Sequence, residues 1–155
     1  MAGKIESRLK ELGIELPAGP APVANYVPYV QSGQLVFIAG QIPLVEGKPA
    51  YVGILGDTVN VKEGQAAARL CAINVISQIK AACGGNLDSV TQCIRLGGYV
   101  SSTQAFSEHP AVVNGASDLM VEVFGDAGRH ARFAVGAGSL PLGVPVEIDA
   151  IFEIS

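Results

Sequence analysis

Three charged side chains near the C-terminus have the types and the spacing to do chemistry. Arg132 lies in the stretch RHARFAVGAG, and Glu147 and Asp149 lie in the stretch VPVEIDAIFEI. The planar fork of an arginine suits a carboxylate, and a glutamate can orient or deprotonate a water molecule. Only 15% of the 155 residues are charged. Three charges placed this close together therefore indicate either a small-molecule site or an ion pair between neighbouring strands.

Two strands, near residues 131–137 and 144–154, are expected to position these side chains. The second strand alternates cleanly, with apolar residues pointing one way and Glu147 and Asp149 pointing the other. The short GSLPLG connection between the strands predicts a hairpin. The charged residues then lie on facing strands of one sheet.

The hairpin register decides which charges meet. If position 137 pairs with position 144, Arg132 lies opposite Asp149, and Ala134 lies opposite Glu147. A slip of two residues would put Arg132 directly against Glu147. In either register the guanidinium has a carboxylate as its neighbour, and small residues such as Ala134 leave room for a ligand beside it.

Apolar periodicity predicts the elements that support these strands. A capping box of Asn60 and Glu63 begins the best-defined helix, and Gly84-Gly85 ends it. Two helices that cover one face of a mixed sheet make a two-layer α+β fold. We expect a single domain over residues 1–155, in which residues 1–16 are a leading helix and linker. The other expected elements are a helix over 4–12, strands over 34–40 and 90–100, and helices over 60–83 and 110–124.

Composition narrows the class of protein. The chain is 49% hydrophobic and has a net charge of −4, without a stripe of Lys or Arg, which argues against nucleic acid as a partner. No apolar run approaches the roughly 18 residues of a membrane span. Three cysteines without metal-ligand spacing favour reduced thiols and a cytoplasmic protein, and offer no metal site. So much apolar surface on a small domain also suggests a homo-oligomer.

Two segments resemble one known family. The stretches NYVPYVQSGQLVFIAGQIP (25–43) and ARFAVGAGSLPLGVPVEIDAI (131–151) are similar to the two signature segments of the reactive intermediate deaminase superfamily, the Rid or YjgF-like proteins. The resemblance implies a chorismate-mutase-like α+β fold and a homotrimer with clefts between subunits. It also implies hydrolysis of enamines and imines, such as 2-aminoacrylate, to 2-keto acids and ammonia without a cofactor.

The resemblance also assigns roles to residues of this chain. Arg132 would grip the carboxylate of a small keto or imino acid, and Glu147 would position the water. Ala39 and Ala134 stand where the family usually has a serine and a cysteine, so the pocket wall differs here. The residues expected to shape the cleft are Tyr26, Ala39, Gly40, Asn114 and Ala134.

Other interpretations of the same residues stay open. Arg132 and Asp149 also fit a plain cross-strand ion pair. The same scaffold also suits a non-catalytic protein that binds small keto acids. An endoribonuclease, a historical label for the superfamily, is the weakest alternative, because the chain is acidic and offers no histidine pair. His109 and His130 are expected in surface or capping roles, with the cleft mouth as an alternative for His130.

Overall fold

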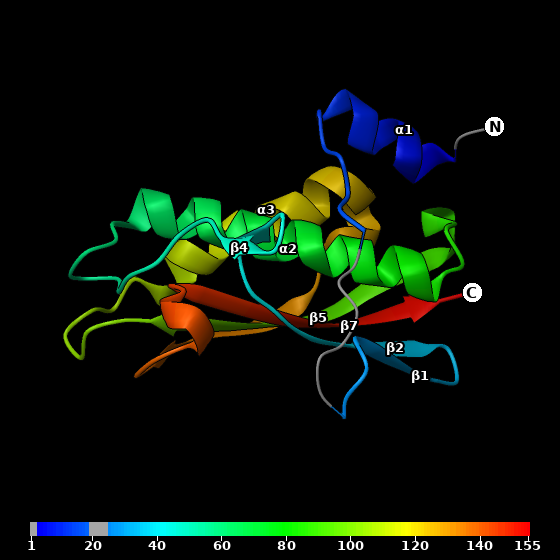
Figure 1. Ribbon diagram of the computed structural model, residues 1–155. Coiled ribbons are helices and arrows are strands. Elements are labelled where there is room, and N and C mark those ends of the chain that lie inside the picture. The colour runs from blue at the N-terminus through cyan, green and yellow to red at the C-terminus, as the bar shows by residue number, and fades with distance from the viewer. Residues whose placement is uncertain (1–2, 19–24) are drawn as a thin grey trace.

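The computed structural model describes residues 3–18 and 25–155. Helices α2 and α3 lie side by side over one face of a five-stranded sheet, and α1 lies above them (Figure 1). The expected α+β fold, with a mixed sheet and two helices on one face, is confirmed. The elements are α1 (Lys4–Glu11), β1 (Tyr29–Ser32), β2 (Leu35–Gln41), β3 (Leu44–Val45), β4 (Lys48–Pro49), α2 (Val61–Ala82), β5 (Val90–Ser101), α3 (His109–Phe124), β6 (Ala131–Ala137) and β7 (Val146–Ile154).

Helix α2 begins and ends where local chemistry dictates. The Asn60 side chain accepts a hydrogen bond from the Glu63 amide at 2.8 Å, and the Glu63 carboxylate accepts one from the Asn60 amide at 3.4 Å. This capping box satisfies two of the amides that the first turn leaves unpaired. Gly84 and Gly85 adopt positive φ angles of 63° and 94° and end the helix, as expected.

The strand order of the main sheet is β1-β2-β7-β5-β6. The expected hairpin between β6 and β7 is therefore wrong, because β5 lies between them. Arg132 is aligned with Leu96, and Asp149 is aligned with Gly97, so neither proposed register exists. The reason is the helix between β5 and β6. A strand–helix–strand unit returns its second strand parallel to the first, which places β6 beside β5 and leaves β7 to pair antiparallel with the other edge of β5.

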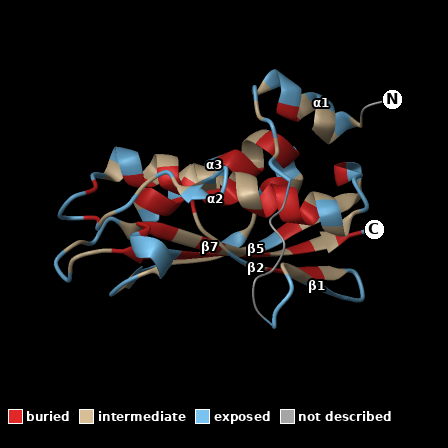
Figure 2. Ribbon diagram, in the orientation of Figure 1, coloured by how far each residue is buried: buried red, intermediate tan, exposed pale blue. Residues whose placement is uncertain are grey.

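The core lies between the sheet and helices α2 and α3 (Figure 2). Alternate residues of β7, from Val146 to Ile154, are buried there, which confirms the alternation read from the sequence. Phe152 is fully buried and meets the ring edge of Phe124 from α3, with a centroid separation of 5.9 Å. Glu147 and Asp149, at the intervening positions, point to the opposite face of the sheet. No helix in the described part of the chain is long and apolar enough to cross a bilayer.

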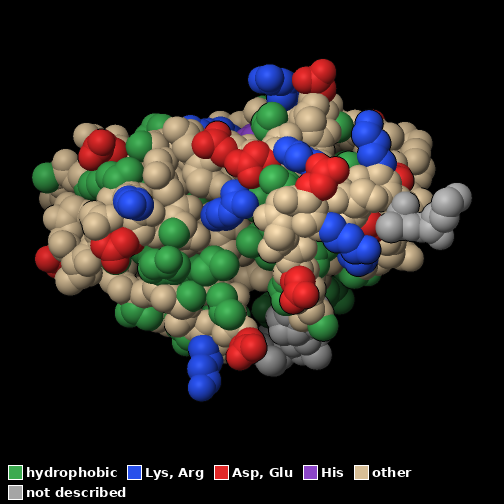
Figure 3. Space-filling model, turned by 90° about the horizontal axis from the view of Figure 1, so that it is seen from above, with side chains coloured by type: hydrophobic (Ala, Val, Ile, Leu, Met, Phe, Trp, Pro, Cys, Tyr) green, Lys and Arg blue, Asp and Glu red, His purple; other side chains and the backbone are tan. Residues whose placement is uncertain are grey.

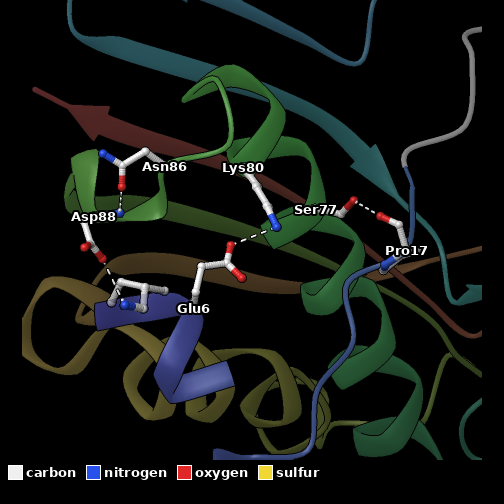
Figure 4. Close-up of polar contacts among 7 residues, drawn as sticks. Glu6, Pro17, Ser77, Lys80, Asn86 and Asp88 are labelled. Atoms are coloured by element: carbon white, nitrogen blue, oxygen red, sulfur yellow. Dashed lines mark hydrogen bonds and ion pairs between the residues drawn. The ribbon is translucent and has the colours of Figure 1, made fainter. Parts of the chain in front are cut away.

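Helix α1 is fastened to the outer side of the helical layer (Figure 4). The Asp88 carboxylate accepts hydrogen bonds from the backbone amides of Ile5 and Lys4 at 2.9 and 3.0 Å. These two bonds, with that from Ile5 the stronger, hold the pKa of Asp88 below its ordinary value. Lys80 of α2 also forms an ion pair with Glu6 at 2.8 Å. The leading helix thus lies on the helical side of the sheet, away from the face that carries Glu147.

Candidate functional site

Arg132 lies on the edge strand β6, and its guanidinium points toward helix α3. Its Nη1 donates to the Ser117 hydroxyl at 3.0 Å, and its Nη2 donates to the carbonyl of Pro110 at 3.2 Å. Within the described residues it forms no ion pair with a carboxylate, whereas the other four arginines each form one. The expected cross-strand pair of Arg132 with Asp149 is therefore wrong. Two bonds leave part of the five-donor guanidinium fork available for a ligand.

A chain of hydrogen bonds holds Arg132 from behind. His130 Nδ1 lies 2.6 Å from the carbonyl oxygen of Gly128, and His130 Nε2 lies 2.9 Å from the Ser117 hydroxyl. A carbonyl can only accept, so Nδ1 carries the proton and Nε2 of the neutral ring accepts from Ser117. The Ser117 oxygen is then free to accept from Arg132. His130 is partly buried in this set of hydrogen bonds, so of the two roles expected from the sequence, surface or capping, the surface role is wrong.

Asn114 and Ala134 lie beside Arg132. Asn114 follows Pro110 by four residues and precedes Ser117 by three, so it shares the helix face that meets Arg132, and its side chain is exposed. Ala134 shares the strand face of Arg132 and is partly buried. Arg132, Asn114 and Ala134 therefore lie where α3 packs beside β6, and we call this region the helix-side groove.

Glu147 lies on the other face of the sheet, against Gly40. A Cβ atom at position 40 would overlap the Glu147 carboxylate, so the glycine is what allows the close approach. Burial, and to a smaller degree the negative charge of Asp149, raises the pKa of Glu147 above its ordinary value. A carboxyl group whose pKa is shifted toward neutrality is better suited to exchange protons with water. Gly40 and Glu147 thus form a second local arrangement, separate from the helix-side groove.

The face around Glu147 combines exposed apolar side chains with charges. Arg95 Nη2 lies 3.5 Å from Asp149 Oδ2, and the Arg95 guanidinium carbon lies 5.5 Å from the centre of the Phe133 ring. Arg95 Nε and Asp149 Oδ1 are buried without a hydrogen-bond partner among the described residues. Exposed apolar residues on the same face are Val30, Phe37, Tyr99 and Val135. We call this the open sheet face.

The sequence-predicted site residues therefore divide into two sets. Arg132, Ala134 and Asn114 share the helix-side groove, while Gly40 and Glu147 meet on the open sheet face. Strand β5 separates the sets, since Leu96 is aligned with Arg132 and Tyr99 with Glu147. Within one chain the sheet itself lies between the guanidinium and the carboxylate.

Of the two remaining predicted residues, Ala39 lies beside the second set, and Tyr26 lies two residues before Pro28, the partner of the Ala39 amide. Ala39 precedes Gly40 in β2 at an irregularity of the pairing with β7. Its amide donates to the carbonyl of Pro28 at 2.9 Å, so it belongs to the backbone that places Gly40. Tyr26 precedes β1, and its side chain is 55% exposed.

Sequence reasoning missed Ser117 and Pro110 as partners of Arg132. A signal for Ser117 was present, because it follows Asn114 by three residues and so shares its helix face. His130 also shares the strand parity of Arg132. None of these residues was linked to Arg132, because the hairpin hypothesis assigned it a carboxylate and left no need for another partner.

Among the described residues, the helical side of the molecule carries no charged patch of one sign (Figure 3), and no metal site is found. Seen from the helical side, acidic and basic side chains are intermixed (Figure 3). In residues 3–18 and 25–155 no group of three or more His, Cys, Asp or Glu side chains is arranged to hold a metal ion. Cys71 and Cys93 are buried, and burial raises the pKa of Cys93 to about 12, which favours the unreactive thiol.

Comparisons with known proteins agree on one family. The family model described as YjgF/chorismate mutase-like, putative endoribonuclease, matches residues 6–150. Protein TCP17 of Trypanosoma cruzi is 47% identical over 155 residues, covering 99% of this chain and 96% of the relative. A crystal structure of a protein of unknown function from Agrobacterium tumefaciens has a TM-score of 0.92 and 50% identity, over 97% of this chain and 92% of that chain.

A more distant structure contains a small ligand. The E. coli protein TdcF, solved with bound serine, has a TM-score of 0.62 and 26% identity, over 89% of this chain and 94% of that chain. The fold, the matched segments and the near full-length relative lead to the same assignment. This chain belongs to the YjgF/chorismate mutase-like family.

Proposed function

We propose that this protein hydrolyses reactive enamines and imines of small 2-keto acids, of the 2-aminoacrylate type, to the keto acid and ammonia. The observation that carries the proposal is Arg132, the one arginine in the described residues without an ion-pair partner, held in place by Ser117 and Pro110. A guanidinium fixed on its rear side and open in front suits a ligand carboxylate. Serine bound to the E. coli relative is a ligand that carries a carboxylate.

In the proposed reaction the enamine first tautomerises to its imine by moving a proton from nitrogen to the β-carbon. Water then attacks the C=N carbon while Glu147 removes a proton from that water, and protonation of the nitrogen lets the C–N bond break. The C=N bond is replaced by C=O, and the nitrogen leaves as ammonia, so the atoms balance without a redox step. The raised pKa of Glu147 supports this role, because a base with a pKa nearer to the working pH exchanges protons more effectively.

We further propose that the complete site forms between copies of the chain in a homotrimer. Arg132 and Glu147 lie on opposite faces of one sheet, so a single copy does not bring them to one ligand. The exposed apolar residues of the open sheet face are the surface that a second copy would cover. In the assembly the helix-side groove of one copy faces Gly40 and Glu147 of another.

The test is ammonia release from 2-aminoacrylate that a second enzyme generates in the assay. Arg132→Ala removes two charge-assisted hydrogen bonds to the carboxylate, so kcat/KM should fall by at least about 100-fold. Arg129→Ala is the matched control, because Arg129 is exposed and pairs only with Asp126. A wild-type protein that releases no ammonia above the uncatalysed rate would overturn the proposal.

Two further measurements separate this proposal from its competitors. Calorimetry with pyruvate reports binding without turnover, and binding without ammonia release would favour a regulatory or metabolite-binding protein. The family description also includes endoribonuclease. RNA degradation that persists in the purified Arg132→Ala variant would favour that activity instead.

A further inference from the structure

A hollow of about 520 Å³ opens where strands β5 and β6 end, at the N-terminus of helix α3. The β5–α3–β6 unit is parallel, and the carboxyl ends of parallel strands are a common location for ligands in such units. None of the residues assigned to the proposed reaction lines this hollow. Its main lining residues are Ser102, Thr103, Gln104, Phe106, His109 and Gly136.

A hydrogen-bonded serine–histidine pair forms one wall of the hollow. The Ser102 hydroxyl lies 3.1 Å from His109 Nε2. The Phe106 ring meets the imidazole edge-on, with a centroid separation of 5.2 Å, and so restrains its orientation. A Cβ atom at position 136 would lie 2.9 Å from His109 Nε2 and 3.1 Å from the Ser102 oxygen. Gly136 therefore gives the pair room against strand β6.

The hollow lies at the far end of the strand face that carries Arg132. Arg132, Ala134 and Gly136 alternate along β6 and share one face, so Arg132 lies at one end of this row and the serine–histidine pair at the other. The four residues of β6 from Arg132 to Gly136 span about 13 Å. The Arg132 side chain reaches part of this distance toward the serine–histidine pair. Its Nη2 bonds the carbonyl of Pro110, the residue directly after His109. A ligand whose carboxylate is held by Arg132 can therefore extend toward His109.

The residues that line the hollow determine which chemical group fits at the end of the ligand remote from its carboxylate. Hydroxyl groups, an amide and an imidazole both donate and accept hydrogen bonds, and none of the lining residues is Lys or Arg. A neighbouring hollow shares Phe106 and is lined by Asp57, Glu63 and Glu108. A second negative charge would lie near these carboxylates without a counterion, so an uncharged polar group fits best.

We propose that the hollow is a specificity subsite for substrates that carry an uncharged hydrogen-bonding group, a hydroxyl or a carboxamide, at the end remote from the carboxylate. The inference rests on the proposed function, because Arg132 anchors the other end. Ser102 and His109 bind the remote group, and Gly136 keeps the space open. The preferred substrates are then larger than 2-aminoacrylate and polar at their side chain.

Calorimetry with freshly dissolved 2-oxo acids tests the subsite without requiring turnover. The two main probes are 4-hydroxy-2-oxobutanoate and its isostere 2-oxopentanoate, which has a methyl group in place of the hydroxyl. The third probe is 2-oxosuccinate, which has a second carboxylate. The wild-type protein should bind the hydroxy acid about tenfold more tightly than its isostere, as expected for one well-placed hydrogen bond.

Variants assign that preference to the hollow. Ser102→Ala, His109→Ala and Gly136→Ala should each remove most of the preference and leave the affinity for pyruvate within about twofold, because Arg132 is untouched. Ser107→Ala is the matched control, since Ser107 is an exposed serine of the same loop outside the lining. The Gly136 variant crowds the serine–histidine pair while keeping both of its side chains, and circular dichroism checks the folding of all four variants.

Three outcomes would overturn the subsite. They are equal binding of the isosteres, a preference that persists in all three lining variants, and tightest binding of 2-oxosuccinate. Absence of ammonia release together with a preference that depends on His109 would reject the proposed catalysis and retain the subsite. If the wild-type protein binds none of the acids, both the anchor and the subsite are rejected.

Discussion

The helix-side groove and the open sheet face differ in whether their side chains find partners within a single chain. In the helix-side groove, Arg132, Ser117, His130 and the Gly128 carbonyl satisfy one another in a continuous chain. On the open sheet face, Arg95 and Asp149 each keep a buried atom without a partner in the described residues, and apolar side chains are exposed.

A buried polar group without a partner is costly, so the open sheet face has the character of a surface that awaits a partner. The groove is already organised in a single copy. Under the proposed function, ligand anchoring is therefore built into the fold, whereas catalysis by Glu147 depends on association.

Mixing two inactive variants gives the sharpest test of that division. Arg132→Ala and Glu147→Gln should each lose at least about 100-fold in activity when assayed alone. If the site lies between copies, co-refolding the two variants in equal amounts should restore about a quarter of wild-type ammonia release, because some interfaces then combine an intact Arg132 with an intact Glu147.

The controls for this mixing experiment are each variant refolded alone and the two variants mixed after folding. No recovery in co-refolded samples that sedimentation shows to be mixed oligomers would contradict a site between copies. A site completed within one chain predicts that result.

Disrupting the open sheet face should dissociate the protein. Phe37 is 42% exposed and is aligned with Ile151 on this face. In Phe37→Asp a desolvated charge replaces apolar contact, so sedimentation should detect monomers, and ammonia release should fall at least about tenfold. Val45→Asp is the control, since Val45 is similarly exposed but lies on the β3–β4 hairpin. Full activity in a monomeric Phe37→Asp protein would show that one chain suffices.

Weakening the chain behind Arg132 should affect binding more than turnover. Ser117→Ala removes the oxygen that accepts from Arg132 Nη1, so KM should rise by about three- to tenfold while kcat changes little. Ser117→Thr retains a hydroxyl group and should restore most of the affinity. A fall in kcat at constant KM would assign Ser117 a role other than positioning the anchor.

The smallest expected effect concerns stability and pH. The pKa of Glu147 is raised in the folded chain, so folding favours its protonated form. The protonated group therefore contributes to the free energy of unfolding at low pH, and this stabilisation is lost as the pH rises through the folded pKa. Glu147→Gln should therefore raise the melting temperature at pH 8 and change it little at pH 4. Thermal melts of the monomeric Phe37→Asp protein, with and without Glu147→Gln, separate this effect on the stability of one chain from any effect on association. A lower melting temperature of Glu147→Gln at pH 8 would contradict the raised pKa.

The sequence by itself determined the local elements of this protein. The capping box at Asn60, the stop at Gly84 and the alternation of β7 depend on residues close together in the chain, so the amino-acid sequence alone is enough to predict them. The same local patterns marked Arg132 and Glu147, and the family resemblance added Gly40. Residue types and spacing were sufficient for this part because the forces involved act over a few residues.

Only the tertiary structure decided which face each functional group occupies. The connection between β6 and β7 is short enough for a hairpin, and nothing local forbids one. The pairing instead follows from the helix between β5 and β6, which returns β6 parallel to β5 and leaves β7 on the other side of it. This strand order puts Arg132 and Glu147 on opposite faces of the sheet. It also lets Arg132 donate a hydrogen bond to Ser117 and places the hollow beside His109. Strand partners are set by packing across the whole sheet, so local sequence patterns do not determine them.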